Sequence, residues 1–300
     1  MSVIMNRSGF LLAAFAALLA LSGCATAPQD AIRVGSYNIR LSSGDKGTPN
    51  AWECRKADLV ALVKKMDLDA FGMQEVCPDQ AQYLRENLPE FAFVGDHREA
   101  DRKSGEASPV FYRKSRFEAE KSGTFWLSET PDVPASKSWG TRCTRVCSYL
   151  VLRDKSNGRR FCFANTHTDH VSALARKEGM KLVVRRMQDF GKGAPIVFTG
   201  DHNCRYNDDP AKAVRKVLKD ARDIAERTEG PHDTFQGFGK YKCGPVDAAG
   251  KDYEDHCIDY IYVSDGTRVL DFATHDDRRP GTDLYPSDHY PIPATVVLPK

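Results

Sequence analysis

Short apolar runs that end in reactive polar side chains are the feature that most constrains this chain. The run at 195–198 (PIVF) reads as a buried strand and leads directly into 199–203 (TGDHN). Asp201 and Asn203 stand two residues apart, so on extended backbone their side chains point the same way. The same letters also suit a turn, so this segment alone leaves both interpretations open.

Four more apolar runs end in the same manner. Their polar ends are Ser36-Tyr37-Asn38, Gln74-Glu75, the segment from Asn165 to His170, and Ser287-Asp288-His289, which precedes the last apolar run. One such end is ordinary loop chemistry. Five in one chain predict a shared site at one rim of a sandwich of two sheets.

The hydrophobic pattern predicts many strands and few helices. We expect strands at 31–39, 70–75, 91–95, 108–113, 123–127, 147–153, 161–168, 195–200, 256–263, 266–275 and 290–298. Helical patterning covers 52–66, 79–87, 172–190 and 210–220. Asn157-Gly158 predicts a hairpin between two of the strands. These elements indicate two sheets flanked by helices.

The ordered set of motifs resembles the endonuclease/exonuclease/phosphatase family, the deoxyribonuclease I-like enzymes. Six motifs follow the family's order: Ser-Tyr-Asn, Gln-Glu, Asn-Thr-His-x-Asp, Thr-Gly-Asp-x-Asn, Ile258-Asp259-Tyr260 and Ser-Asp-His. The resemblance covers about residues 31 to 299. It implies an α/β (α+β) fold, a four-layer sandwich of two mostly antiparallel β-sheets flanked by helices.

The length and the net charge limit the number of domains and the classes of function. A chain of 300 residues is long enough for one full core, and we expect a single catalytic domain at 31–300 in a monomer. The formal net charge is +2. That value argues against tight, sequence-independent DNA binding, although it leaves nucleases open.

The first residues have the pattern of an export signal. Arg7 precedes an apolar stretch from Phe10 to Leu21 that is too short to span a membrane. Leu21-Ser22-Gly23-Cys24 resembles a bacterial lipobox. This resemblance implies a signal peptide at 1–23, a lipid on Cys24, a tether at 24–30 and a place in the cell envelope. Ala25 resembles sorting to the outer membrane. A plain signal peptide is the alternative.

The cysteine count permits disulfides in an exported chain. Nine cysteines less Cys24 leave an even number. We expect two pairs, Cys54 with Cys77 and Cys243 with Cys257, and we expect Cys162 to be a buried apolar residue. A zinc site formed by Cys243, His256 and Cys257 is the rival, without C-x-x-C spacing to support it.

Glu75 is the expected metal ligand. A lone strand-end carboxylate suits Mg²⁺, which takes few protein ligands and keeps its waters. The family resemblance makes Glu75 the principal ligand and places Asn38 and Asp288 beside the metal or its waters. We expect Mg²⁺, with Mn²⁺ or Ca²⁺ as alternatives.

The resemblance also assigns the catalytic residues. Asp201 and Asn203 match the pair that orients the attacking water or the phosphate. His289 would face the scissile phosphate, and Asp259 would orient its imidazole. His167 matches a second catalytic histidine, paired with Glu106, which precedes Arg113 at the family's spacing.

Arginines and extra histidines complete the candidate site. Arg145, together with Arg142, is expected to clamp phosphate oxygens. His202 stands where the family usually has an aromatic or small apolar residue, and His170 is extra to the motif. We expect both histidines to be hydrogen-bonded neighbours of the site; binding of substrate or a second metal is the alternative.

The sequence therefore predicts a metal-dependent phosphoesterase. Phosphodiester hydrolysis, with nucleic acid as one class of substrate, is the leading reaction. The alternatives are a phosphomonoesterase, a sphingomyelinase-like hydrolase, and a non-catalytic binding lipoprotein that keeps the same fold. Fold and motifs alone do not identify the substrate.

Overall fold

The computed structural model describes residues 28–241 and 255–299. Its helices and strands are given in chain order. They are β1 (Ile32–Asn38), α1 (Trp52–Lys65), β2 (Ala70–Gln74), α2 (Pro78–Asn87), β3 (Phe91–Val94), β4 (Val110–Arg113), β5 (Phe117–Trp126), β6 (Val146–Asp154), β7 (Arg160–His167), α3 (Ala173–Gly191), β8 (Ile196–Asp201), α4 (Asp209–Arg215), β9 (Leu218–Asp220), β10 (Thr228–Glu229), β11 (Asp259–Ser264), β12 (Arg268–Ala273) and β13 (Ile292–Val297).

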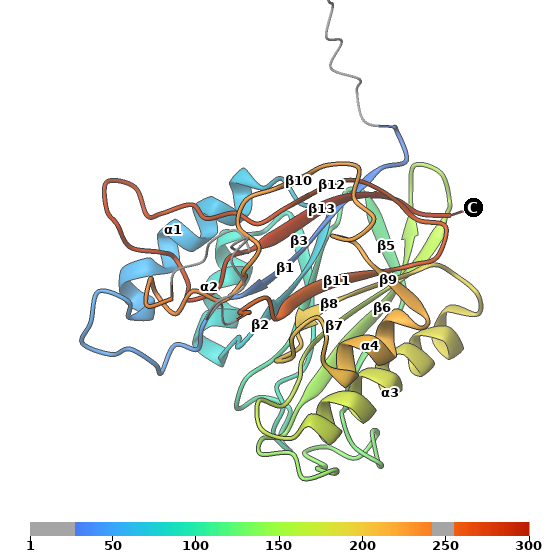
Figure 1. Ribbon diagram of the computed structural model, residues 1–300, viewed down its shortest axis with the longest axis horizontal. Helices are drawn as coiled ribbons and strands as arrows, with labels where there is room; N and C mark the ends of the chain where they lie inside the picture. Colours follow the sequence, from blue (N-terminus) through green and yellow to red (C-terminus); the bar gives the residue numbers. More distant parts are fainter. Residues whose placement is uncertain (1–27, 242–254, 300) are drawn as a thin grey trace, which may run out of the picture.

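Two sheets stack face to face, with helices outside each of them (Figure 1). One sheet has seven strands in the order β10-β12-β13-β1-β2-β4-β3, and the other has six in the order β5-β6-β7-β8-β11-β9. Most neighbours are antiparallel, but three pairs are parallel: β1 with β2, β7 with β8, and β10 with β12. The predicted four-layer sandwich is confirmed.

Three apolar clusters hold the layers together. The inter-sheet cluster includes Val34, Leu150 and Phe163. A second cluster packs α3 and α4 on the six-stranded sheet, and a third packs α1 and α2 on the seven-stranded sheet. The strands are thus covered on both faces, which explains why their sequences read as continuous apolar runs.

Helix α3 shows how the local sequence determines an element. The Ser172 hydroxyl accepts a hydrogen bond from the backbone N–H of Ala175 at 3.1 Å and caps the helix. Met180, Val183 and Met187 recur on one buried face. The cap and the apolar face begin the helix immediately after the strand end that carries His167.

Some predicted elements differ from the structure. The fourth helix ends at Arg215, and Leu218–Asp220 forms the short strand β9 instead of continuing it. Strand β10 has only two residues, too few to give a periodic pattern. Among the described residues, no helix combines the length and the apolar character that crossing a membrane requires.

The predicted pair of Cys54 and Cys77 is wrong, because both thiols are free. Helix α1 turns Cys54 toward solvent, whereas Cys77 immediately precedes α2. Cys162 is the buried apolar residue that its strand position predicted. Cys257 is buried and free, which contradicts its predicted disulfide with Cys243. Cys243 itself, and with it the zinc alternative, lies outside the described residues, as do residues 1–23 and Cys24.

Candidate active site

The predicted strand ends meet at one pocket. It has a volume of about 340 Å³ and opens at the rim where β1, β2, β7 and β8 end. Its lining includes most of the residues predicted from the motifs: Glu75, Glu106, Arg145, His167, Asp201, Asn203, Asp288 and His289. Asn38 and Asp259 lie directly behind this lining and bond to it.

Glu75 is held in place by its backbone and by two hydrogen bonds. Its φ is +63°, an unusual value for a residue other than glycine. Asn38 Nδ2 donates to Oε1 at 3.2 Å, and the backbone N–H of Leu41 donates to Oε2 at 2.8 Å. A carboxylate has about four acceptor positions, so both oxygens keep capacity for another partner.

Asp288 brings a second carboxylate to the same wall of the pocket. The Ser287 hydroxyl donates to its Oδ1 at 3.3 Å, and Arg40 Nε lies 3.7 Å from its Oδ2. Glu75 and Asp288 give the pocket two carboxylates with few other protein ligands, and the Asn38 amide supports Glu75 through its nitrogen. Hard cations such as Mg²⁺ prefer this kind of set, so these residues fit the metal that the motifs predict.

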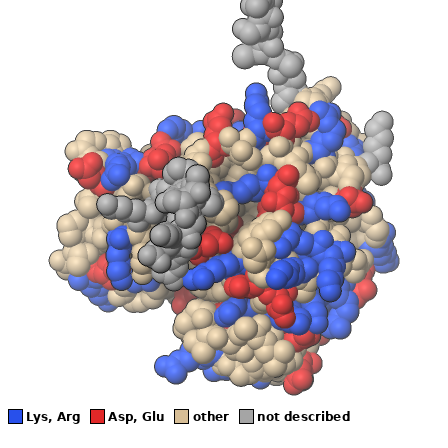
Figure 2. All heavy atoms as spheres, in the orientation of Figure 1, with Lys and Arg blue, Asp and Glu red and all other residues tan. Residues whose placement is uncertain are grey.

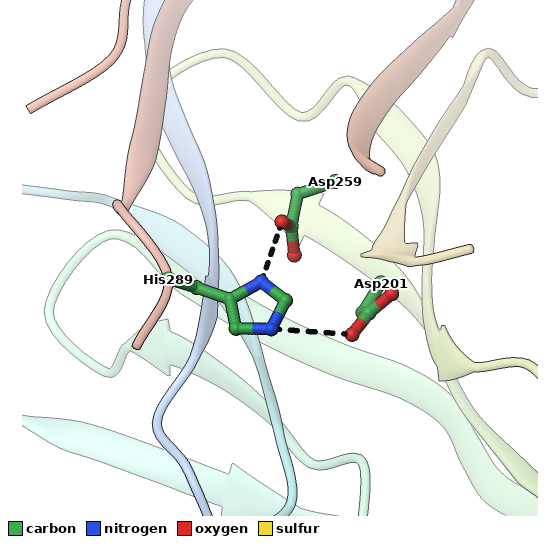
Figure 3. A group of neighbouring side chains, drawn as sticks. All are labelled: Asp201, Asp259 and His289. Carbon is green, nitrogen blue, oxygen red and sulfur yellow. Dashed lines mark hydrogen bonds and ion pairs between the residues drawn. The ribbon is translucent and has the colours of Figure 1, made fainter. Parts of the chain in front are cut away.

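Asp201, Asp259 and His289 form a separate cluster, with ligand atoms within 4.8 Å of one another (Figure 3). His289 Nδ1 lies 2.7 Å from Asp259 Oδ2, and its Nε2 lies 3.7 Å from Asp201 Oδ2. The imidazole is thus already engaged by carboxylates on both sides. Such an arrangement is suited to proton transfer and charge stabilisation.

His289 has a strongly perturbed charge state. Burial alone would favour the neutral imidazole, but Asp259, Asp201 and Asp288 outweigh it and raise the pKa of His289 to about 10. His289 is therefore an imidazolium near neutral pH. Asp259 fixes the ring so that Nε2 faces the pocket.

Asp201 is buried beside other acids. Its burial and the negative charge of Asp259 raise the pKa of Asp201, although His289 and the Asn38 amide oppose the shift. Asn38 Nδ2 donates to Oδ2 at 2.9 Å, and the Asn203 backbone N–H donates to Oδ1 at 3.0 Å. A carboxylate with a raised pKa is suited to accept a proton from water.

His167 lies between Asn203 and Glu106. Asn203 Nδ2 lies 2.9 Å from its Nε2, and Asp201 Oδ2 lies 3.4 Å from the same nitrogen. Glu106 Oε2 is 3.9 Å from Nδ1, within ion-pair range but too far for a hydrogen bond. Burial, and then the positive charge of Arg145, lower the pKa of His167, so its ring is neutral.

A group of arginines forms the basic wall of the pocket. Arg145 is 6% exposed and lies 3.6 Å from Glu106 and 3.2 Å from His170 Nδ1. Arg98 Nη1 lies 2.8 Å from Glu106 Oε1. Arg40 and Arg98 were not predicted, since both come from loops without a pattern. Arg142 is exposed and is not part of the pocket lining.

The two extra histidines differ from each other. His170 lines the pocket beside Arg145, as expected for a neighbour of the site. His202 is fully buried and lies in the core, with its ring stacked on Tyr260 and Tyr262 at centroid distances of 5.7 and 5.5 Å. Neither ring nitrogen has a hydrogen-bond partner, so the expectation that His202 is a hydrogen-bonded neighbour of the site is wrong.

Asp169 organises the pocket rim. Its carboxylate accepts hydrogen bonds from the backbone N–H groups of Arg142, Cys143, Val171 and Ser172. Burial opposes its ionisation, but these bonds outweigh the effect and lower the pKa of Asp169 to about 2. The Asp of the Asn-Thr-His-x-Asp motif thus joins the loop before β6 to the start of α3.

The fold and the pocket define an enzyme class, and comparison with known proteins gives the family. Residues 35–289 match the model of the Endonuclease/Exonuclease/phosphatase family, and the chain belongs to this family. Its members are phosphoester hydrolases that typically depend on a divalent metal ion.

Solved structures show the same relation. An endonuclease/exonuclease/phosphatase from Bacteroides vulgatus is 32% identical with a TM-score of 0.82, covering 90% of this chain and 99% of the other. The mannosyl-6-phosphatase of Bacteroides thetaiotaomicron is 31% identical with a TM-score of 0.79, covering 89% and 100%. This chain is similar to both.

Curated relatives are more distant. Human tyrosyl-DNA phosphodiesterase 2 is 23% identical over 139 residues, which is 46% of this chain and 33% of that protein. The chain spans less than half the length of the curated relatives it matches.

Proposed function

We propose that the chain is a divalent-metal-dependent hydrolase of small phosphoesters, with a sugar phosphomonoester as the first candidate substrate. The observation that carries the proposal is the meeting of three functional groups in one pocket. These are the oxygen ligands around Glu75, the Asp259–His289 pair, and Asp201 with Asn203.

Glu75 and Asp288 would hold the metal, with the Asn38 amide fixing Glu75. Mg²⁺ is the first candidate, and Mn²⁺ and Ca²⁺ are the alternatives. When bound, the ion supplies positive charge that polarises the phosphoryl group and offsets the charge that develops there.

The protein residues divide the remaining work. Asp201, with its raised pKa, accepts the proton of the attacking water, which Asn203 helps to orient. The His289 imidazolium stabilises charge on the phosphoryl oxygens through Nε2–H. Neutral His167 presents its second nitrogen toward Glu106, and Arg145 binds phosphate oxygens.

Two observations support a small phosphomonoester. The pocket volume of about 340 Å³ suits a small molecule. The second is the 31% identity to the mannosyl-6-phosphatase over its whole length. Figure 2 adds that Lys and Arg alternate with Asp and Glu over most of the visible face, apart from basic residues near α4.

Phosphodiester cleavage, the reaction that the sequence favours, is the second candidate. Its support is the similarity to tyrosyl-DNA phosphodiesterase 2 over part of the chain. The mixed surface charge and the net charge of +2 make long nucleic acids the less favoured substrates for this reaction.

An activity panel tests the proposal. It contains mannose 6-phosphate, bis-p-nitrophenyl phosphate, plasmid DNA, RNA and sphingomyelin, each with Mg²⁺, Mn²⁺ or Ca²⁺, and Asp201→Asn is the inactive control. Turnover of the sugar phosphate above the diesters is the expected result. Preference for a diester would support the second candidate, and turnover of no phosphoester would support a binding module.

We also propose a lipid-anchored monomer in the bacterial cell envelope. The support is the Leu-Ser-Gly-Cys sequence at 21–24. Cys24→Ser is expected to leave the precursor unprocessed and without a lipid. Mass spectrometry of the native protein that finds Cys24 unmodified would contradict the anchor, and light scattering checks the monomer.

A further inference from the structure

The chain enters the domain at the end opposite the pocket. Asp30 pairs with Arg159 at 2.9 Å, and Arg116 donates to the Ala31 carbonyl at 2.7 Å. Arg159 also donates to the Leu298 carbonyl, so the two ends of the described chain lie together. In Figure 1, β1 runs from this blue start, in the upper part of the view, toward the site.

Strands from both sheets separate this end from the pocket. Strand β1 begins at Ile32, near the entry, and ends at Asn38, behind the pocket. Strand β7 begins at Arg160 and ends at His167 in the pocket wall. With a rise of about 3.3 Å per residue, these strands put roughly 20 Å between the entry and the pocket.

The predicted tether matches this separation only when it is fully extended. Cys24 and Asp30 are six positions apart in the sequence, and a fully extended chain spans about 3.3–3.6 Å per residue. The tether therefore reaches at most about 22 Å, close to the length of β1. A flexible tether of this length has an r.m.s. span of only about 13 Å, so it keeps the entry end, and not the pocket end, next to the anchor point.

We propose that an anchor on Cys24 holds the pocket facing away from its own membrane, so the substrates are water-soluble phosphoesters and not lipid headgroups of the anchoring leaflet. This inference rests on the proposed lipid anchor and the proposed hydrolase activity. It narrows the substrate class, because phospholipids and sphingomyelin in the anchoring leaflet lie outside the reach of the pocket.

A distance measurement tests the orientation independently of activity. Asn157→Cys at the entry end and Leu174→Cys at the pocket end, both exposed positions, would each carry a fluorescent donor. The background carries Cys54→Ser, Cys77→Ser, Cys143→Ser and Cys243→Ser; the first three remove the exposed and partly exposed thiols of the described residues. The lipid-modified full chain is placed in liposomes that contain an acceptor-labelled lipid.

We expect strong energy transfer from position 157 and weak transfer from position 174. Leu174 and its neighbour Val171 are exposed apolar residues at the pocket end, where a mouth that faced the membrane would touch it. Equal transfer, or stronger transfer from 174, would overturn the proposal. So would a native chain that carries no lipid on Cys24.

A tether variant tests the consequence for the substrate. About 60 Gly and Ser residues inserted before Pro28 add an r.m.s. span of about 40 Å and leave the contacts of Asp30 intact. Each anchored chain is assayed with two substrates: phosphatidic acid in the same vesicles, and p-nitrophenyl phosphate in solution.

Both chains are expected to hydrolyse the soluble ester at equal rates. The chain with the native tether should not hydrolyse phosphatidic acid. This expectation holds whether or not the chain with the extended tether hydrolyses that lipid. Hydrolysis of that lipid by the native chain would overturn the orientation. Failure to hydrolyse either ester would instead contradict the proposed hydrolase function, while the energy transfer still decides the orientation.

Discussion

Asp259 and His289 show how one carboxylate changes the chemistry of an imidazole. The 2.7 Å contact fixes the ring and keeps it charged inside a buried site. Members of such a pair act as a unit, so their mutational losses do not multiply. We expect His289→Ala to lower kcat by at least about 10²-fold and Asp259→Asn to lower it somewhat less.

The double variant should therefore resemble His289→Ala alone. A double-mutant cycle on kcat checks this, with circular dichroism as the control for folding. Strictly multiplicative losses would show that the two side chains act separately.

His202 should make the fold sensitive to acid. Burial lowers the pKa of His202 to about 3, from 6.5 for an exposed histidine. Because the folded-state pKa is depressed, the unfolded chain takes up a proton that the folded chain refuses. The contribution of neutral His202 to the free energy of unfolding is therefore fully present above about pH 6.5 and is lost as the pH falls toward 3.

His202→Phe keeps an aromatic ring between the tyrosines and removes this titration. Between pH 7.5 and 5, the native chain should lose about 2 kcal/mol more unfolding free energy than the variant. Urea unfolding at both pH values measures the difference. Parallel losses in the two proteins would refute the assignment.

At the residue scale, the motifs correctly predicted the site residues that lie at the ends of strands. Ten of the residues proposed for catalysis, metal and substrate binding lie in or directly behind the pocket, and Arg142 is the exception. Arg40 and Arg98 could not be predicted, since loops bring them there from segments without periodicity. His202 was misjudged because alternation along β8 turns its side chain away from the two site residues that flank it.

At the scale of elements, Asn165 couples the two sheets immediately below the site. Its Nδ2 donates to the Met73 carbonyl at 2.7 Å, and Gln74 Nε2 donates to its Oδ1 at 2.7 Å. Gly72 leaves room for this bridge, because a Cβ there would lie 2.2 Å from Asn165 Cγ. The Asn of the Asn-Thr-His motif therefore joins β7 to β2.

Gly72→Ala should destabilise the fold by about 1–3 kcal/mol, since the added methyl overpacks a buried and hydrogen-bonded contact. Gly123→Ala is the control, because its Cβ would meet only the partly exposed Tyr149 ring, at 3.0 Å. Thermal unfolding compares the two variants. An equal or larger loss in Gly123→Ala would contradict this role of Gly72.

The elements that the sequence failed to predict are those too short to carry a hydrophobic pattern. Long strands and helices were predicted because their apolar faces repeat over several turns or pleats. Strands β9 and β10 are too short for any period and form only because neighbours present free edges. The Cys54–Cys77 pair failed because the direction of two side chains depends on tertiary packing.

At the scale of the whole molecule, the sandwich brings distant segments to one rim. Residues from Asn38 to His289 contribute to one pocket, so no shorter fragment contains the site. The order of the motifs made this prediction possible, whereas pocket volume and surface charge required the structure. Our proposal of a small phosphoester substrate rests on the pocket volume and on the similarity to the mannosyl-6-phosphatase.

Metal dependence at Glu75 is the central claim, and a metal titration of hydrolysis tests it most directly. The native chain, Glu75→Gln and the distant exposed control Glu53→Gln are stripped with EDTA and titrated with Mg²⁺. We expect EDTA to abolish turnover, Mg²⁺ to restore it in the native chain and the control, and Glu75→Gln to need far more metal and to remain at least about 10²-fold slower. Undiminished turnover in excess EDTA, or one titration curve shared by all three proteins, would contradict the account.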